Sequence, residues 1–503
     1  MKKLLVFSLA FVLIISALLL VGCSKEPENE PAAECTHSYE KTVTNPTCTE
    51  AGEEKFSCTK CDYYFTFEIE ATGHTGGTPV EENSTICMDG KYDSVVYCTV
   101  CDAEVSRETV TVTEKMHDVK NGVCIACGGK ESTPGLRYSQ NDDGTYTVTG
   151  EGACMETDIV IGIYNNRDVT TIGDMAFYGC DSLTSIVISD SVTTIGECAF
   201  YGCTSLASIE LPDSFTTIDW MAFAYCPSLT SIELPDSLTT IGGYAFYYCT
   251  SLTSIVIPEG VTTIDGPAFS DCTSLTSIEL PDSLTTIGYE AFRGCTSLTS
   301  IVIPEGVTTI DYMAFYNCTS LTSIEIPEGV TAIDDKAFSN CTSLASIELP
   351  DSLTSIGEDA FSGCTSLTSI TVAEGNENYK SIDGNLYNKD GKTLIKYAIG
   401  KTVTTFTVPE GVTTIDGAAF SNCTSLTSVE LPDSLTTIAW SAFSNCTSLT
   451  RIVIPKGVTI IGYRAFSNCT SLTIYCEVAK KPSGWDYSWN YSNRPVVWGY
   501  KGE

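Results

Sequence analysis

Histidine is scarce in this chain of 503 residues, which contains only His37, His74 and His117. Basic residues are also few, since 27 Lys and Arg accompany 63 Asp and Glu and the formal net charge is −36. Because many acid–base and nucleophilic mechanisms rely on histidine, the stretch after residue 117 is a poor candidate for an enzyme. The excess negative charge repels nucleic-acid phosphates, so we expect no nucleic-acid partner.

Long apolar runs are absent from the sequence after its first 22 residues. Lys2 and Lys3 precede an apolar stretch over residues 4–20, which predicts a secretory signal peptide over 1–22. Leu20-Val21-Gly22-Cys23 resembles the bacterial lipobox, which implies lipid on the Cys23 thiol and a membrane-anchored lipoprotein exported to the cell surface. An uncleaved membrane anchor is the alternative, because the stretch is nearly long enough to span a bilayer. Residues 23–34 predict a disordered tether.

Cysteine and histidine concentrate between residues 35 and 127. Two units share one layout, which consists of a single Cys, a Cys-x-x-Cys pair and one His. Each unit thus contains four possible ligands, and tetrahedral zinc requires four ligands of this kind. We therefore predict structural zinc in small β modules over residues 35–130. The twelve expected ligands are Cys35, His37, Cys48, Cys58, Cys61, His74, Cys87, Cys98, Cys101, His117, Cys124 and Cys127.

Disulfides are the alternative for these cysteines, because exported small domains are often cross-linked in this way. Nine cysteines cannot all pair internally, however, and disulfides give the histidines no role. Which residues share each metal ion stays open, since the repeated units and the neighbouring Cys-x-x-Cys pairs give equally sensible groupings. In either case the role of this region is structural.

A 23-residue repeat occupies most of the remaining chain, as in the stretch from Asn340 to Phe361. One cysteine marks its register, and a single gap of 59 residues holds an insertion at about 373–408. Such a period predicts a solenoid over residues 170–475, with a β-hairpin cap over 131–169 and a second cap over 476–503. The ladder cysteines are Cys180, Cys203, Cys226, Cys249, Cys272, Cys295, Cys318, Cys341, Cys364, Cys423, Cys446 and Cys469.

Each repeat predicts two strands and one turn. Leu-x-x-Ile-x-Leu/Ile reads as a strand that proline ends, Val/Leu-Thr-Thr-Ile as a second strand, and the stretch up to Ala-Phe-x-x-Cys as one helical turn. The pattern resembles the BspA or Treponema type of leucine-rich repeat, and the Cys/His region resembles zinc-ribbon-like modules of bacterial surface proteins. The expected fold class is mainly β with short helical turns, a solenoid of about twelve coils capped at both ends.

The resemblance implies a surface protein that adheres to host or neighbouring-cell macromolecules. The alternative is a passive spacer of the cell envelope, and the oligomeric state stays unknown. The ladder cysteines are expected to be free and buried, because no histidine lies near them. A row of glutamates that includes Glu210 and Glu233 reads either as a cation-binding edge or as a solvated face.

Aromatic residues crowd the variable positions of the early coils, where later coils carry Ser and Asn. Tyrosine and tryptophan favour binding surfaces, so we predict ligand binding there, with turn packing as the alternative. The aromatics at the C-terminal end read mainly as a shield for the last coil, with sugar binding as the alternative. The predicted ligand-binding residues are Trp220, Tyr244, Tyr289, Tyr312, Tyr201, Tyr225 and Tyr248, with Tyr178, Tyr247 and Tyr316 beside them.

Overall fold

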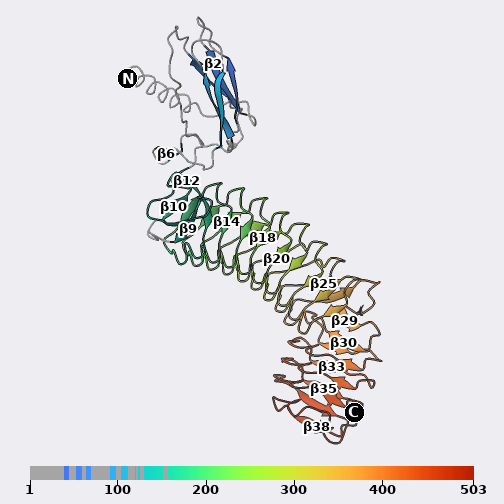
Figure 1. The fold of residues 1–503 in the computed structure, drawn as a ribbon. Helices are drawn as coiled ribbons and strands as arrows, with labels where there is room; N and C mark the ends of the chain where they lie inside the picture. Colours follow the sequence, from blue (N-terminus) through green and yellow to red (C-terminus); the bar gives the residue numbers. More distant parts are fainter. Residues whose placement is uncertain are drawn as a thin grey trace, which may run out of the picture. The chain divides into compact units, whose positions relative to one another are not determined.

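The computed structural model describes residues 39–44, 52–58, 64–69, 91–97, 104–111, 119–120, 123–124, 130–150 and 157–502. The chain divides into two compact units (Figure 1). The first comprises Met1–Pro134, Tyr138–Thr147 and Val160–Thr170, and the second comprises Gly135–Arg137, Val148–Ile159 and Thr171–Glu503. The repeats lie in the second unit. The expected signal peptide, tether and Cys23 lie outside the described residues.

The first unit contains antiparallel strands in the Cys/His region. Strands β1, β2 and β3 form one sheet, β4 pairs with β5, and β6 pairs with β7. The Cys-x-x-Cys pairs at 58/61 and 98/101 fall where one strand of an antiparallel pair connects to the next. The strands are β1 (Tyr39–Thr44), β2 (Gly52–Cys58), β3 (Tyr64–Ile69), β4 (Lys91–Tyr97), β5 (Glu104–Thr111), β6 (Val119–Lys120) and β7 (Val123–Cys124).

A hairpin precedes the first coil, where the sequence predicts one. Strands β8 (Arg137–Gln140) and β9 (Tyr146–Gly150) pair across a turn in which the Gly144 N–H donates to the Asn141 carbonyl at 3.0 Å. In the second unit, the Val148 carbonyl of β9 accepts a hydrogen bond from the Gly173 N–H at 2.8 Å. The sheet edge of the first coil is therefore paired rather than open. The next strands are β10 (Asp158–Ile161), β11 (Ile163–Tyr164) and β12 (Arg167–Ile172).

The predicted solenoid is confirmed, with two rows of parallel strands along the second unit. In the first row, Ile209 of β15 lies opposite Ile232 of β17, one coil further on. Burial alternates along these strands, so the isoleucine points inward while the flanking Ser and Glu point outward. This row comprises β13 (Ser185–Ile188), β15 (Ser208–Glu210), β17 (Ser231–Glu233), β19 (Ser254–Val256), β21 (Ser277–Glu279), β25 (Ser346–Leu349), β27 (Ser369–Val372), β31 (Thr405–Thr407), β33 (Ser428–Glu430) and β35 (Arg451–Ile454).

The second row consists of the predicted Thr-Ile strands, which pair in register from coil to coil, as Ile195 does with Ile218. Threonine side chains also join the coils, because the Thr239 hydroxyl donates to the Thr216 carbonyl at 3.1 Å. The strands are β14 (Thr194–Ile195), β16 (Thr217–Ile218), β18 (Thr240–Ile241), β20 (Thr263–Ile264), β22 (Thr286–Ile287), β23 (Thr309–Ile310), β24 (Ala332–Ile333), β26 (Ser355–Ile356), β32 (Thr414–Ile415), β34 (Thr437–Ile438) and β36 (Ile460–Ile461).

The expected helical turn is wrong in detail, because the described residues contain no helix. Each coil instead has a residue with positive φ directly before its ladder cysteine, between 57° at Asn468 and 74° at Gly363. This backbone conformation directs the N–H toward the next coil, as when Asn340 donates to the Ser362 carbonyl at 2.7 Å. The hydrogen bond that would extend a helix is thereby replaced by one along the solenoid axis.

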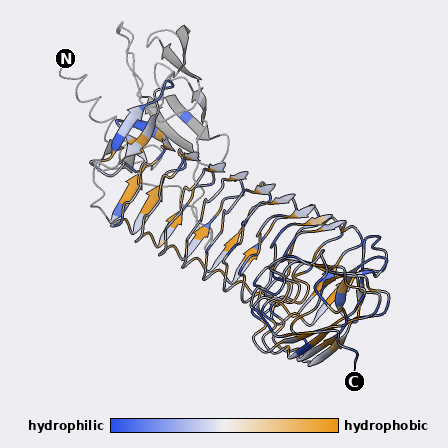
Figure 2. Cartoon of the chain, turned by 90° about the horizontal axis from the view of Figure 1, so that it is seen from below, coloured by the Kyte–Doolittle hydropathy of each residue, from blue (hydrophilic) through white to orange (hydrophobic). Residues whose placement is uncertain are grey.

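Stacked phenylalanines form the core of the solenoid, and hydrophobic residues recur along its strands (Figure 2). From Phe177 to Phe361, consecutive rings lie 5.2 to 5.8 Å apart with planes 1° to 16° from parallel. A second stack runs from Tyr397 through Phe420 to Phe466. Because each ring contacts the next coil, no coil buries its apolar face alone.

The insertion separates the coils into a first block, with ladder cysteines Cys180 to Cys364, and a second block, with Cys423 to Cys469. Within it, β28 (Tyr379–Ile382) and β29 (Asn385–Asn388) are antiparallel, and β30 (Thr393–Lys396) pairs in parallel with β32. Tyr397 follows β30 and takes the place of a core phenylalanine, with its ring 5.0 Å from that of Phe420. The insertion therefore supplies a coil of its own.

The C-terminal end shields the last coil, as expected. Strands β37 (Thr473–Cys476) and β38 (Val496–Trp498) extend the first row. Trp489 lies edge-on to Phe466 with ring centroids 5.9 Å apart, and Trp485 packs 4.8 Å from Trp489. Both indoles are buried, so they cover the end of the second stack rather than present a sugar-binding face.

Candidate functional site

The cysteine ladder is a packing feature. The thiol of Cys226 donates to the Phe200 carbonyl at 3.1 Å, and most ladder cysteines repeat this bond to the phenylalanine 26 residues earlier. Burial raises the pKa of the Cys226 thiol well above its ordinary value and that of Cys203 to about 12. Because the thiolate is the nucleophile, a raised pKa makes these two thiols poor nucleophiles, whereas a hydrogen bond with Cys446 lowers the pKa of Cys469.

Cys180 is an exception to the expectation of free thiols, because it is disulfide-bonded. Its partner is none of the cysteines from Cys198 to Cys476, which are all free and buried. Two of those, Cys198 and Cys476, lie outside the ladder and were missed by the repeat pattern. The first coil is thus covalently tied, whereas the later coils are joined by packing and hydrogen bonds.

Lys396 fills an interruption of the ladder. Gly400 lies 23 residues before Cys423, and a Cβ there would lie 2.3 Å from the Ser366 carbonyl carbon, so a ladder cysteine does not fit. The buried Lys396 ammonium instead donates to the Ala418 carbonyl at 2.9 Å. Burial lowers the pKa of Lys396, with the Cys364 and Cys423 thiols among its neighbours. The repeat pattern does not predict this substitution, because Lys396 is not at the ladder position.

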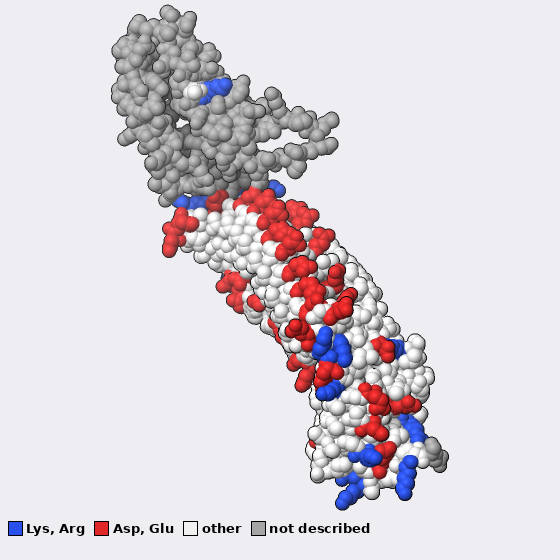
Figure 3. All heavy atoms as spheres, turned by 90° about the vertical axis from the view of Figure 1, so that its right-hand side faces the viewer, with Lys and Arg blue, Asp and Glu red and all other residues white. Residues whose placement is uncertain are grey.

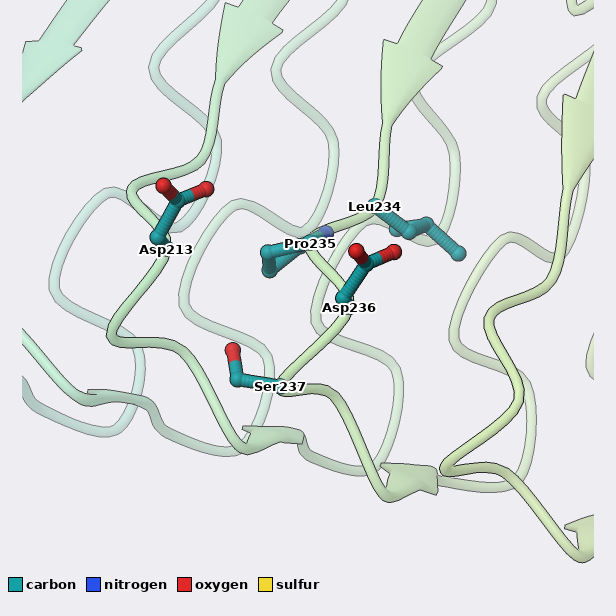
Figure 4. Close-up of a pocket in the computed structure, with 5 residues that line it drawn as sticks. All are labelled: Asp213, Leu234, Pro235, Asp236 and Ser237. Atoms are coloured by element: carbon teal, nitrogen blue, oxygen red, sulfur yellow. The ribbon is translucent and has the colours of Figure 1, made fainter.

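A shallow hollow of about 470 Å³ lies on the turns between the two strand rows (Figure 4). It is lined by Asp213 of one coil and by Leu234, Pro235, Asp236 and Ser237 of the next. The Ser237 hydroxyl is engaged, because it donates to the Phe215 carbonyl at 2.5 Å. No thiol, imidazole or amine lines the hollow, so its groups do not form a nucleophilic site.

The aromatic residues of the early coils lie together on the turns near the ladder cysteines. The Tyr178 and Tyr201 rings stack at 4.7 Å, and Tyr225 stacks on Tyr248 at 5.2 Å. Edge-to-face contacts connect further rings, and Tyr244 is hydrogen-bonded to Tyr289. We call this connected group the aromatic corner, which comprises Tyr178, Tyr201, Trp220, Tyr225, Tyr244, Tyr247, Tyr248 and Tyr289.

Most of the predicted ligand-binding residues thus fall in the aromatic corner. Trp220 is 39% exposed, Tyr248 41% and Tyr289 44%, so these rings are not turn packing alone. Tyr312 is exposed one coil beyond Tyr289, but it joins none of the ring contacts among the described residues. Burial raises the pKa of Tyr247 to about 12, which keeps its hydroxyl protonated. The corner therefore offers phenol and indole groups as hydrogen-bonding and apolar contacts.

Three tyrosines of the corner have positive φ, and two of them, Tyr225 and Tyr248, stand directly before ladder cysteines. Tyr225 has φ of 58° and Tyr248 of 61°, directly before the ladder cysteines. The other ten coils place residues there that tolerate this region, namely Gly179, Gly202, Asp271, Gly294, Asn317, Asn340, Gly363, Asn422, Asn445 and Asn468. A bulky residue at positive φ costs about 1–2 kcal/mol. Bulky residues also take positive φ at a second turn position of other coils, as Met313 and Lys336 do, so strain alone does not mark a site.

Acidic side chains surround the aromatic corner. An oxygen of Asp265 lies 3.8 Å from the position that a Cβ of Gly243 would take, and Asp219 directly precedes Trp220. Burial and the neighbouring carboxylates Asp311 and Asp335 raise the pKa of Asp334. Figure 3 shows Asp and Glu in rows along the face of the solenoid in view. The expected stacking of Glu210 over Glu233 is confirmed by their register.

The side chains of the twelve predicted zinc ligands lie outside the described residues, so the prediction stands as made. Among the side chains that the structure does describe, no group of three or more His, Cys, Asp or Glu could hold a metal ion. Over the same residues, no helix is long and apolar enough to cross a membrane.

Comparison with known proteins agrees with the repeat geometry. A family model of the BspA type leucine-rich repeat region, with six copies, matches residues 170–299, 262–394 and 396–477. A leucine-rich repeat protein from Bacteroides ovatus is 31% identical, with 73% of this chain and 91% of that chain covered and a TM-score of 0.51.

Two further solved structures are similar in sequence. A leucine-rich cell surface protein from Faecalibacterium prausnitzii is 30% identical, with 73% of this chain and 94% of that chain covered and a TM-score of 0.45. The T. pallidum leucine-rich repeat protein is 31% identical, with 42% of this chain and 91% of that chain covered and a TM-score of 0.33. No curated protein matches the chain.

Proposed function

Because the chain belongs to the BspA-type leucine-rich repeat family, we propose that its solenoid binds macromolecules at the cell surface. In this proposal the protein is an adhesin for proteins or glycans of host or neighbouring cells. The solenoid suits such a role, since stacked coils give a long surface on which side chains can vary without disturbing the core. The fold alone does not specify the function, so the assignment depends on a particular surface.

The aromatic corner is the observation that carries this proposal. Eight aromatic residues from neighbouring coils are in contact, and several of them are more than one third exposed. Tyrosine and tryptophan are enriched where binding energy concentrates. Tyr225 and Tyr248 also hold backbone strain that glycine or asparagine relieves in the other coils.

We also propose how the solenoid is held at the surface. The signal sequence and the lipobox-like segment ending at Cys23 support export and a lipid anchor. The residues between them and the solenoid would form a stalk stabilised by structural zinc. Its support is the pattern of Cys-x-x-Cys pairs at the connections between antiparallel strands, such as β4 and β5. In that role the ions fix the fold of the stalk and take no part in a reaction.

Binding of the full chain to immobilised host-cell surface proteins and to glycan arrays tests the proposed function. The triple variant Trp220→Ser, Tyr244→Ser, Tyr289→Ser removes the exposed centre of the aromatic corner. We expect binding to fall at least about tenfold, because loss of one hot-spot aromatic commonly costs about 2 kcal/mol or more. Thermal melting of each variant verifies that the solenoid remains folded.

A matched control changes three exposed apolar residues of the first strand row, Val187→Ser, Val256→Ser and Val302→Ser. These valines are 41%, 58% and 77% exposed, so their replacement alters the apolar surface without touching the aromatic corner. This control is expected to bind like the unmodified chain. Equal loss in both variants would contradict the assignment to the corner, and a full chain that binds neither proteins nor glycans would favour the passive spacer.

A further inference from the structure

We infer that the aromatic corner and the carboxylates beside it form a docking surface for a protein segment rich in arginine. This inference rests on the proposed function and names the chemistry of its partner. Three observations carry it: the charge around the corner, the way its rings are stacked, and the arginine–tyrosine contacts that the chain makes within its second block.

The charge around the corner is almost entirely negative. Asp219, Asp265 and Asp311 lie at equivalent positions of alternate coils, each in the turn that carries or borders the aromatic residues. The basic residue nearby, Arg293, is already engaged by Asp271 at 3.2 Å and by Glu290 at 3.7 Å. The corner therefore complements a basic segment rather than a neutral or acidic one.

The rings of the corner are stacked on one another and are flanked by hydrogen-bond acceptors. The Tyr178 and Tyr201 planes are 3° from parallel and those of Tyr225 and Tyr248 are 22° apart, so each ring covers a face of its neighbour. The phenol oxygens and the nearby carboxylates accept hydrogen bonds, and a guanidinium offers five donors in a planar fork.

The second block shows how arginine packs on tyrosine in this fold. The guanidinium of Arg451 lies 4.5 Å from the Tyr475 ring centroid and 5.0 Å from that of Tyr500. Arg464 lies over Tyr463 in the same way, at 4.9 Å. Across the described side chains of the first block, by contrast, no cation lies over an aromatic ring. The chain thus supplies its own arginines to the exposed tyrosines of one block and leaves those of the other to a partner.

Synthetic twelve-residue peptides test this inference with the full chain. The probes alternate glycine with arginine, with lysine or with serine. We expect the arginine peptide to bind, the lysine peptide to bind at least about threefold more weakly because it lacks the planar fork, and the serine peptide not to bind. Affinity for the arginine peptide is expected to fall as the salt concentration rises.

A charge-matched pair of variants separates docking from general attraction by an acidic protein. Asp219→Asn, Asp265→Asn, Asp311→Asn neutralises three carboxylates in the turns that carry or border the corner, while Asp213→Asn, Asp236→Asn, Asp282→Asn neutralises three on the turns between the strand rows. Both remove three negative charges. We expect at least a tenfold loss of arginine-peptide affinity in the first variant and less than a twofold loss in the second.

Equal losses in the two variants would overturn the inference, because they would show non-specific attraction. Displacement of the arginine peptide by neutral sugars would also overturn it, because this result would show that the corner binds a glycan. The proposed function can survive either result: if the aromatic variant loses binding to cell-surface macromolecules while the corner carboxylate variant keeps it, only the arginine inference fails. Melting curves of all variants exclude unfolding as the cause.

Discussion

The first and second blocks of the solenoid have the same backbone and differ in what they place on it. Before the ladder cysteines, the first block carries glycine, aspartate, asparagine or tyrosine, whereas the second carries only asparagine. Those asparagines form a ladder, in which Asn445 donates to Asn422 at 3.0 Å and Asn468 donates to Asn445 at 2.9 Å. The second block thus uses this position for stability, while the first block accepts strain there.

The difference shows that some positions of the repeat determine the periodic fold, whereas other positions are available for binding. The inward positions repeat because each must fit the coil before and the coil after it. The positions on the turns are free to vary, and two neighbouring coils use this freedom to hold Tyr225 and Tyr248. Departures from the repeat are therefore more informative about binding than the repeat itself.

The largest effect is expected from removing a core ring in one block only. Phe315→Ala and Phe443→Ala each delete a fully buried ring and should cost about 3–5 kcal/mol. Within the described residues no ring contact joins Phe361 to Tyr397, so each loss should remain within its own block. Hydrogen exchange read by mass spectrometry measures this. Equal loss of protection in both blocks after either change would show a single cooperative unit instead.

Thiol alkylation compares the two blocks at the ladder. Burial raises the pKa of Cys272 in the first block and, to about 12, that of Cys364 at its end. We expect the buried thiols with a raised pKa, such as Cys272 in the first block and Cys446 in the second, to react at pH 8 at least about 100-fold more slowly than after unfolding in guanidinium. Peptide mapping after alkylation gives the rate at each site. Fast labelling of Cys272 in the folded chain would contradict this account of the ladder.

Exchanging residues between the blocks tests the strain. Tyr248→Asn should raise the free energy of unfolding by about 1 kcal/mol, because asparagine tolerates positive φ, and should weaken binding. The reciprocal Asn445→Tyr should lower the free energy of unfolding by about 1–2 kcal/mol, because the substitution introduces strain and interrupts the asparagine ladder. Denaturant titration measures both. A destabilised Tyr248→Asn variant would mean that ring stacking outweighs the strain.

Lys396, between the two blocks, gives the smallest expected effect. Burial lowers the pKa of Lys396, so the charged ammonium is less stable in the folded chain than in the unfolded chain. The charge therefore lowers the free energy of unfolding. This cost is full below the folded pKa and disappears as the pH rises through the unfolded value of 10.5. Lys396→Met should be about 1 kcal/mol more stable at pH 7, with the gap closing toward pH 10.5. A gap that widens with pH would contradict this.

Much of the solenoid can be predicted from its sequence, because coil length, inward positions and strand-ending prolines all follow one period. Burial of the ladder thiols follows from their place after an apolar turn. The absence of helix does not follow from the repeat pattern, because only the structure shows positive φ at residues as different as Met175 and Lys336. The bond at Cys180 and the amine of Lys396 are single departures from the period, so a repeat pattern cannot indicate them.

The candidate site was predictable in part. Enrichment of tyrosine on the turns indicated a surface, and the structure brings most of these rings into contact. The positive φ at Tyr225 depends on backbone conformation, and the contact of Arg451 with Tyr500 joins residues 49 positions apart. These features indicate the chemistry of the proposed partner, and they cannot be predicted from the spacing of residues in the sequence.

Hydroxyl-radical footprinting of the full chain, with and without the arginine–glycine peptide, tests the central claim most directly. The account predicts that oxidation of Trp220, Tyr248 and Tyr289 falls several-fold when the peptide is bound. Tyr463 and Tyr487, which are 43% and 87% exposed in the second block and the C-terminal cap, should be oxidised equally in both samples. Unchanged oxidation of the first-block aromatics, or equal protection of Tyr463 and Tyr487, would contradict the assignment of binding to the aromatic corner.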